Sequence, residues 1–305
     1  MMAVELIDEA IDFADELAVD VWELDNGATV VDFGVETVGG VEAGLLLAEI
    51  QTGGLATVQT AMDSVAGAPL THVELQTDHP ALGLLCAQKA GWELSLPGFE
   101  GLGSGPARAL VAEEEEFTRT GFADEADFAV LAIETDTLPV AKVAEHVAGM
   151  AGVDPAATFL PVFATGSITG SVTLAARAAE LAAFRLAELG YDPLDLLSVT
   201  GRAPVAPVAA DEEAAMARTN DALAYGSEVH LTLAEPFDRF EEVASTAREE
   251  YGRPFAEVFE EADWDFAEVP RGVFAPAKVT LDVVGGETRV VGELDEALVA
   301  ESFGL

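Results

Sequence analysis

Leu160-Pro-Val-Phe-Ala-Thr-Gly-Ser-Ile-Thr-Gly-Ser-Val-Thr-Leu-Ala-Ala-Arg-Ala-Ala-Glu180 combines three kinds of segment in one run. Its first residues belong to an apolar strand pattern that begins at Thr158 and ends at Ala164. A turn of small residues continues to Gly170, and an Ala-rich helix pattern then runs to Gly190. A strand, a turn and a helix in this order are typical of the α/β class.

Strand and helix patterns alternate along the rest of the chain as well. An Asn26-Gly27 turn predicts a hairpin over residues 21–35, because this dipeptide accommodates the positive φ of a tight turn. We expect helices at 4–18, 39–50, 80–90, 139–151, 211–223 and 236–251, and a short one at the C-terminus. We expect further strands at 71–77, 128–134, 229–233, 277–284 and 288–291. The alternation predicts an α/β protein with two lobes.

The lobe boundary is expected in the acidic stretch at 113–125, which we interpret as a solvated surface segment. This places a first α/β lobe at residues 1–123 and a second at 124–305, although chains of this class often cross between lobes more than once. The second lobe carries the Ala-rich helix.

The composition defines a globular but very acidic protein. Of 305 residues, 50% are hydrophobic, which is enough for a large core and excludes a disordered acidic chain. The 56 acidic and 14 basic residues give a formal net charge of −42. Because the acids are spread along the sequence, they indicate a protein of a high-salt cytoplasm, where ions screen the repulsion. The charge argues against nucleic acid and anionic membranes as partners.

The sequence lacks a targeting or membrane signal. Residues 1–9 show no basic region followed by an apolar core, and no apolar run approaches the ~20 residues of a membrane span. We therefore expect a soluble, cytoplasmic protein.

Metal and nucleotide sites have little support in the sequence. The single cysteine, Cys86, has apolar neighbours and is interpreted as a buried small hydrophobe. The four histidines show no metal-ligand spacing, so we expect structural histidines and no metal site. Neither a Walker A loop nor a Gly-x-Gly-x-x-Gly fingerprint is present.

Arg177 and Glu180 are the strongest candidates for chemistry. No ionisable side chain lies between Asp154 and Arg177, and the pair would share a helix face with Thr173 and Phe184. An Arg that precedes its Glu stabilises a helix by ~0.2–0.5 kcal/mol at best. The alternatives are a structural ion pair and a catalytic one, in which Glu180 serves as general base or as counterion to a cationic substrate.

Two loops are candidates for ligand binding. The segment from Gly98 to Arg108 contains four glycines, so backbone could approach a ligand while Arg108 holds a phosphate or carboxylate. The alternative is a flexible connection. The turn from Ala164 to Ser171 could present backbone N–H groups to an anion, or it could be a plain capped turn with close helix packing.

Several segments together resemble the archaeal methenyltetrahydromethanopterin cyclohydrolases. They are Leu24-Asp-Asn-Gly-Ala-Thr-Val-Val-Asp-Phe-Gly-Val35, Thr77-Asp-His-Pro80 with Ala90-Gly-Trp92, Gly103-Ser-Gly-Pro-Ala-Arg-Ala-Leu110, Arg218-Thr-Asn-Asp221, Tyr251-Gly-Arg-Pro-Phe255, Gly272-Val-Phe-Ala-Pro-Ala277 and Ser302-Phe-Gly-Leu305. The resemblance extends from about residue 20 to the C-terminus.

The resemblance implies a two-lobed α/β subunit, a substrate cleft between the lobes and a homotrimer. It also implies hydrolysis of an N5,N10-methenyl pterin cation to the N5-formyl pterin, without a metal or organic cofactor. The catalytic Arg and Glu of the family fall on Arg177 and Glu180. By position and composition only, Ser104, Gly105 and Arg108, together with Thr173, are expected to contact the substrate. The alternatives are the same reaction on methenyltetrahydrofolate and a pterin-binding protein without catalysis.

Overall fold

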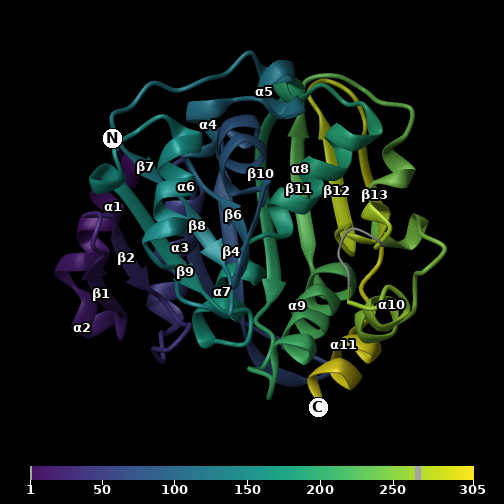
Figure 1. Ribbon diagram of the computed structural model, residues 1–305. Coiled ribbons are helices and arrows are strands. Elements are labelled where there is room, and N and C mark those ends of the chain that lie inside the picture. The colour runs from purple at the N-terminus through teal and green to yellow at the C-terminus, as the bar shows by residue number, and fades with distance from the viewer. Residues whose placement is uncertain (1, 265–268) are drawn as a thin grey trace. The chain divides into compact units, whose positions relative to one another are not determined.

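The computed structural model describes residues 2–264 and 269–305, which form two compact units (Figure 1). Unit 1 consists of Met1–Thr57 and Ala81–Thr173, and unit 2 of Val58–Pro80 and Leu174–Leu305. The chain therefore changes unit three times. This division differs from the single boundary expected at 123/124, because the strands that follow residue 124 pair within the sheet of unit 1. The α/β class with two units is confirmed.

Unit 1 is built on a seven-stranded sheet with the order β1-β2-β9-β8-β6-β5, to which β7 adds beside β9. The strands are β1 (Asp20–Glu23), β2 (Thr29–Asp32), β5 (Trp92–Leu96), β6 (Phe99–Ser104), β7 (Ala129–Val130), β8 (Ala132–Glu134) and β9 (Thr158–Phe163). Strands β2, β8 and β9 are parallel, whereas β1, β5 and β6 pair antiparallel with their neighbours. The parallel strands end together, at Asp32, Glu134 and Phe163.

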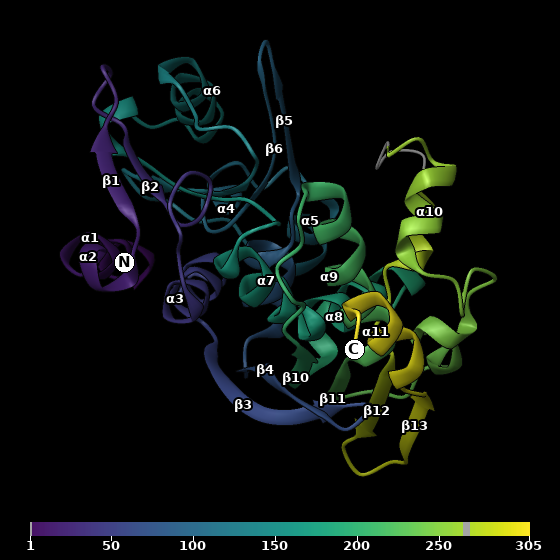
Figure 2. The same ribbon diagram turned by 90° about the horizontal axis from the view of Figure 1, so that it is seen from below.

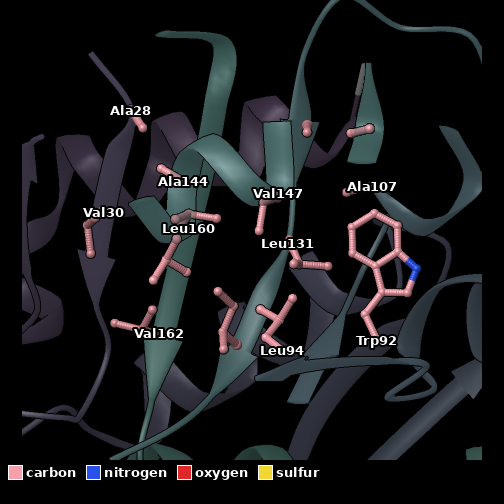
Figure 3. Packing of buried hydrophobic residues seen from close by; sticks show 14 of the residues in the cluster. Ala28, Val30, Trp92, Leu94, Ala107, Leu131, Ala144, Val147, Leu160 and Val162 are labelled. Carbon is pink, nitrogen blue, oxygen red and sulfur yellow. The ribbon is translucent and has the colours of Figure 1, made fainter. Parts of the chain in front are cut away.

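Helices cover both faces of the unit 1 sheet, because its side chains alternate between two apolar clusters. Val30 packs with the helix α6 (Ala141–Ala151) in the cluster of Figure 3, while Val31 packs with α1 and α3 in the other. The other helical segments of unit 1 are α1 (Met2–Asp12), α2 (Ala14–Leu17), α3 (Val41–Gln51), the π-helix η1 (Pro80–Gln88), α4 (Arg108–Val111), α5 (Glu115–Thr120), the 3-10 turn η2 (Pro155–Ala157) and α7 (Ile168–Ala175).

Unit 2 is built on a six-stranded sheet with the order β13-β12-β11-β10-β4-β3. The strands are β3 (Thr57–Val65), β4 (Ala68–Thr77), β10 (Leu196–Pro204), β11 (Glu228–Leu233), β12 (Lys278–Val283) and β13 (Thr288–Gly292). Only β11 and β12 are parallel among the pairs whose register is resolved. Buried and more exposed positions alternate along β11 and β12, which indicates one covered and one open face.

Helices α8 and α9 contact the covered face of this sheet, as Figure 2 shows for α8 beside β10 and β11. The helical segments of unit 2 are α8 (Ala178–Leu189), α9 (Glu212–Gly226), α10 (Phe255–Glu261), α11 (Glu296–Phe303) and the 3-10 turns η3 (Pro193–Asp195), η4 (Phe240–Glu242), η5 (Ser245–Ala247) and η6 (Arg271–Val273). Helices α10 and α11 pack on α9.

Several expected elements are confirmed, and others are wrong. The hairpin at Asn26-Gly27 forms with φ +84° at Gly27. The segment at 236–251 forms two short 3-10 turns in place of a helix. Residues 99–104, expected as a loop, form β6, because Gly101 and Gly103 allow Ile133 and Leu131 to pack directly against the strand. Strands β3, β5 and β10 and helix α10 were not expected.

Candidate active site

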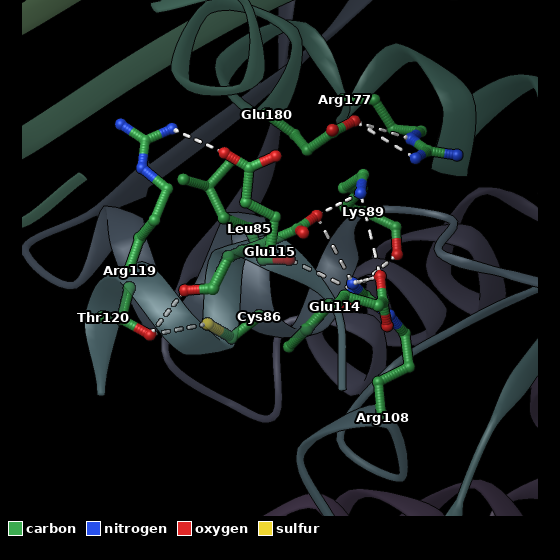
Figure 4. Close-up of polar contacts among 12 residues, drawn as sticks. Leu85, Cys86, Lys89, Arg108, Glu114, Glu115, Arg119, Thr120, Arg177 and Glu180 are labelled. Atoms are coloured by element: carbon green, nitrogen blue, oxygen red, sulfur yellow. Dashed lines mark hydrogen bonds and ion pairs between the residues drawn. The ribbon is translucent and has the colours of Figure 1, made fainter. Parts of the chain in front are cut away.

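Arg177 and Glu180 form a buried ion pair at the start of α8 (Figure 4). Arg177 Nη2 lies 3.1 Å from Glu180 Oε2, and Arg177 Nε donates a hydrogen bond of 3.2 Å to the same oxygen. The side chains are 13% and 3% exposed, respectively. Because both contacts go to Oε2, the other carboxylate oxygen takes no part in the pair. Arg177 therefore holds the Glu180 carboxylate through one oxygen, and the other oxygen makes no contact with the guanidinium.

The backbone around the pair differs from the expected continuous helix. Helix α7 ends at Ala175, Arg177 precedes α8 with φ −85° and ψ 0°, and Glu180 lies in the first turn of α8. The partial positive charge of a helix N-terminus favours a carboxylate in this turn. The break therefore gives Glu180 a second source of stabilisation besides Arg177.

Thr173 does not belong to the same helix as the pair. Its side chain is fully buried in unit 1, where Oγ1 donates a hydrogen bond of 3.0 Å to the carbonyl of Gly44. A Cβ on Gly44 would lie 2.6 Å from Cβ of Val172, so α3 and α7 pack closely at this point. The hydroxyl of Thr173 thus serves the α3–α7 contact, and the expectation of one helix face through Thr173, Arg177 and Glu180 is wrong.

Arg108 lies fully buried among protein acceptors (Figure 4). Its Nε and Nη2 donate to the two oxygens of Glu114, at 2.9 and 2.5 Å. Its Nη1 donates to the carbonyls of Leu85, Ala87 and Lys89. The guanidinium does bind a carboxylate by a bidentate fork, as expected for a ligand, but the carboxylate belongs to the chain itself.

The acidic segment beside Arg108 is correspondingly not a purely solvated surface. Glu116 pairs with Lys89, and Glu114 with Arg108. Burial raises the pKa of the Glu116 carboxyl, but the hydrogen bond from Lys89 and the charges of Lys89 and Arg108 lower that pKa below its usual value. Two acids of the run therefore hold α5 against the end of η1.

Ser104 and Gly105 are also part of the interior of unit 1. Ser104 Oγ accepts a hydrogen bond of 3.1 Å from Gln51 Nε2. Gly105 has φ +116°, which favours glycine, and its N–H donates to the carbonyl of Ala87. Ser104, Gly105 and Arg108 are close in the sequence, and their contacts stabilise the connection between β6 and α4.

The turn from Ala164 to Ser171 is capped by its own residues. Ser167 Oγ donates to the carbonyl of Ala164 and accepts from the N–H of Gly170. A Cβ on Gly170 would overlap the carbonyl oxygen of Ala164, so the turn needs glycine here for space. These contacts match a plain capped turn with close packing.

Sequence reasoning missed Asp32, which organises the neighbouring loop at the end of β2. Its buried carboxylate accepts hydrogen bonds from the N–H groups of four consecutive residues, over 2.6–3.0 Å; they are Gly34, Val35, Glu36 and Thr37. The signal was present, because an Asp at the end of a strand, two residues before a glycine, is typical of a side chain that caps its own loop. A Cβ on Gly34 would lie 2.5 Å from Ser167 Oγ, so this loop packs on the turn after β9.

The ends of β8 and β9 carry a second missed contact. Thr165 Oγ1 donates a hydrogen bond of 2.5 Å to Glu134 Oε1. Asp32, Glu134 and Thr165 therefore mark the carboxyl edge of the parallel strands in unit 1, the edge at which open α/β sheets bind ligands.

Three of the segments that carry the resemblance meet at Asp221 in α9. Its Oδ1 accepts the N–H of Phe255 at 2.9 Å, and its Oδ2 accepts the hydroxyl of Ser302 at 2.6 Å. Burial raises the pKa of Asp221 to about 6, although these two hydrogen bonds oppose the shift. The carboxylate joins α9 to α10 and α11, so these segments are structural in unit 2.

Cys86 is buried, and burial raises the pKa of its thiol, which confirms the interpretation as a small hydrophobe. Of the four histidines only His72 is buried. Within residues 2–264 and 269–305, no group of three or more His, Cys, Asp or Glu side chains is placed to hold a metal ion. In the same part of the chain, every helix falls short of the length and apolar character that a membrane span requires.

Comparisons with known proteins agree with the resemblance. The sequence model of the family described as "Cyclohydrolase (MCH)" matches residues 1–303. The methenyltetrahydromethanopterin cyclohydrolase of Halobacterium salinarum is 57% identical over 304 residues, which cover 100% of this chain and 98% of the relative. The enzymes of the same name from Methanocella arvoryzae and Methanospirillum hungatei are 40% and 38% identical, over 98% and 99% of this chain and 96% and 98% of their own length.

The α/β scaffold, the family model that matches residues 1–303 and relatives that align over nearly the whole chain define this protein as a hydrolase. The chain belongs to the methenyltetrahydromethanopterin cyclohydrolase family. The roles of individual residues, the cleft between the lobes and the homotrimer stay predictions.

Proposed function

We propose that the chain hydrolyses the N5,N10-methenyl bridge of methenyltetrahydromethanopterin to the N5-formyl pterin, with Glu180 and Arg177 as the catalytic pair. The observation that supports these residues is the buried Glu180 carboxylate, held at one oxygen by Arg177. Membership of the cyclohydrolase family supports the substrate. The proposal of site residues rests on this pair alone.

The charge of the substrate suggests the mechanism. The methenyl bridge is an amidinium-like cation, so its carbon is already electrophilic. Glu180 takes a proton from water as the oxygen–carbon bond forms, which gives a neutral carbinol. N10 then receives that proton as the carbon–N10 bond breaks, and the hydroxyl group loses its own proton to solvent as the formyl group forms on N5. One water is consumed and one proton released, and we propose that no metal or organic cofactor takes part.

Arg177 orients the base in this mechanism. It occupies Oε2 with two N–H groups, which leaves Oε1 to accept the proton of water. The carboxylate that it holds attracts the cationic bridge. We further propose a cytoplasmic homotrimer, which size-exclusion chromatography with light scattering in multimolar KCl would test.

The decisive test is Glu180→Gln, assayed by loss of the methenyl chromophore in multimolar KCl. Removal of a general base lowers kcat by about 10²–10⁴-fold, and we expect a much smaller change in KM. Helix α8 supplies a matched control, since Arg185 and Glu188 form a second pair with the same spacing. We expect Glu188→Gln to keep kcat within about twofold. Wild-type turnover in the Glu180→Gln variant would contradict the assignment.

The same assay separates the alternatives. Faster Glu180-dependent hydrolysis of methenyltetrahydrofolate than of methenyltetrahydromethanopterin would make the folate the carrier. Tight binding of either compound without acceleration of hydrolysis would identify a pterin-binding protein.

A further inference from the structure

We propose that Gly201 is a positioning residue for Glu180, because a side chain at this position would push the first turn of α8 away from the sheet. This inference rests on the proposed role of Glu180 and adds a residue on another element to the active site. Gly201 has no contact with substrate in this proposal.

Gly201 occupies the middle of the unit 2 sheet. It lies in β10 opposite Leu75 of β4 on one side and Val229 of β11 on the other. The buried positions of β10 on either side of it are Val199 and Ala203. Helix α8 contacts β10, and Figure 2 shows the helix beside this strand. The strand cannot move freely, because both of its neighbours are paired along its length.

The space above Gly201 is filled by the backbone of α8. An added Cβ would lie 2.6 Å from the backbone N of Ala179 and 3.0 Å from its Cα and Cβ. Real Cβ atoms do not approach other atoms to 2.6 Å, and a backbone atom cannot rotate away as the end of a flexible side chain does. Gly201 lies outside the positive-φ glycines, so the position requires space and not an unusual backbone conformation.

The strained atoms belong to the residue directly before Glu180. Ala179 is fully buried, and the three atoms nearest the added Cβ are its N, Cα and Cβ, so no flexible side chain at this contact can absorb the displacement. A shift of this turn by a few tenths of an ångström moves the Glu180 carboxylate relative to a bound substrate. Catalytic groups lose efficiency on this scale, because their productive geometry is held within about 0.5 Å.

The test is Gly201→Ala, measured as kcat and KM in multimolar KCl together with thermal unfolding. We expect kcat to fall by about tenfold or more while KM changes less than about threefold. Gly226→Ala is the matched control, because a Cβ on Gly226 would crowd Pro204 of the same strand at 2.9 Å, away from the first turn of α8. That variant should lose stability but keep kcat within about twofold.

A mutant cycle separates positioning from general damage. The cycle adds Gly201→Ala to the Glu180→Gln variant and measures single turnovers with enzyme in excess. The rate constant should fall less than about twofold, because Gly201 acts by positioning a carboxylate that this variant lacks. Ala179→Val, which crowds the same contact from the helix side, should reproduce the loss of kcat if the Gly201→Ala variant does not fold.

The outcomes are distinguishable. Absence of hydrolysis by the wild type would contradict the proposed function, and with it the positioning role, but not the packing of Gly201 against Ala179. An active wild type with unchanged kcat in both Gly201→Ala and Ala179→Val would overturn the positioning role alone. Equal losses in Gly201→Ala and Gly226→Ala, or full additivity with Glu180→Gln, would also overturn it.

Discussion

Glu180 and Glu188 lie on one helix, and each pairs with an arginine three residues earlier, yet their surroundings differ. The Glu180 side chain is 3% exposed and lies in the first turn, while Glu188 is 29% exposed and lies in the last. The helix dipole therefore supports the negative charge of Glu180 and opposes that of Glu188. Spacing alone does not separate the two pairs, whereas burial and position in the helix do.

Asp221 allows a prediction about pH at the same scale. Its folded pKa of about 6 lies above the usual 3.8, so the folded state binds the proton more tightly than the unfolded state. The unfolding free energy therefore falls as pH rises through the window from about 4 to 6, by about 3 kcal/mol in total. The Asp221→Asn variant lacks this loss and should gain stability relative to the wild type as pH rises.

Denaturant unfolding of both proteins at pH 4, 5, 6 and 7 in constant KCl measures the difference. A stability difference that stays constant over this range would show that Asp221 does not titrate there. The comparison cancels the other carboxylates, which are the same in both chains.

At the scale of elements, one ion cluster connects three segments of unit 1. Arg108 at the start of α4 binds the carbonyls of Leu85, Ala87 and Lys89 at the end of η1, and Glu114 just before α5. A Cβ on Gly91 would overlap Glu114 Oε2, so glycine at that position leaves room for the cluster. Glu114 and Glu116 of the acidic run are thereby tied to the interior of the unit, while Glu113 and Glu115 stay exposed.

We expect Arg108→Met to destabilise the protein by about 3–5 kcal/mol, because it leaves buried carbonyls and a carboxylate without their donor. Thermal or denaturant unfolding in multimolar KCl provides the measurement. Arg289→Met is the control, since its pair with Glu287 is exposed and should have no measurable effect. Equal stability of the two variants would mean that Arg108 is not a structural residue.

At the scale of the whole molecule, we expect the net charge of −42 to make stability depend on salt, because like charges on a compact chain repel each other. Helix α1 is an example of this repulsion, because Glu5, Asp8 and Asp12 are exposed acids at spacings of three and four residues. Like charges at these spacings repel each other by about 0.2–0.5 kcal/mol per pair at low ionic strength. Screening by salt relieves such repulsion everywhere on the surface.

The unfolding temperature should therefore rise steeply between 0.1 and 2 M KCl. The triple variant Glu5→Gln, Asp8→Asn, Asp12→Asn reduces the net charge from −42 to −39 (42 − 3 = 39). We expect it to be more stable than the wild type at low KCl, with the difference vanishing at high KCl. Sucrose in place of KCl should not remove the difference, and a difference independent of salt would contradict the electrostatic account.

The fold was predictable where local patterns are strong. The hairpin at Asn26-Gly27, the strand at 158–164 and the helices near residues 41–51 and 141–151 follow from turn chemistry and apolar periodicity. Strands such as β6 were missed because their glycines serve close packing against a neighbouring strand, which no local pattern reports. Two 3-10 turns near residue 240 replaced the helix expected at 236–251.

The candidate site was predictable in part, for the same reason. An Arg and a Glu in a region without other charges pointed to the pair that the structure shows in contact. The sequence could not show that Arg108 binds Glu114 of the same chain, because an arginine in a glycine-rich segment looks the same in a ligand site and in a core.

By itself, the sequence determined the α/β class, the family and the acidic surface, because these depend on composition and on patterns along the chain. Only the tertiary structure decided that Arg108 and Thr173 serve the interior, that Asp32 holds its loop and that Gly201 lies under the residue before Glu180. These facts depend on which distant segments meet, and burial together with hydrogen-bond partners is fixed only when the chain has folded.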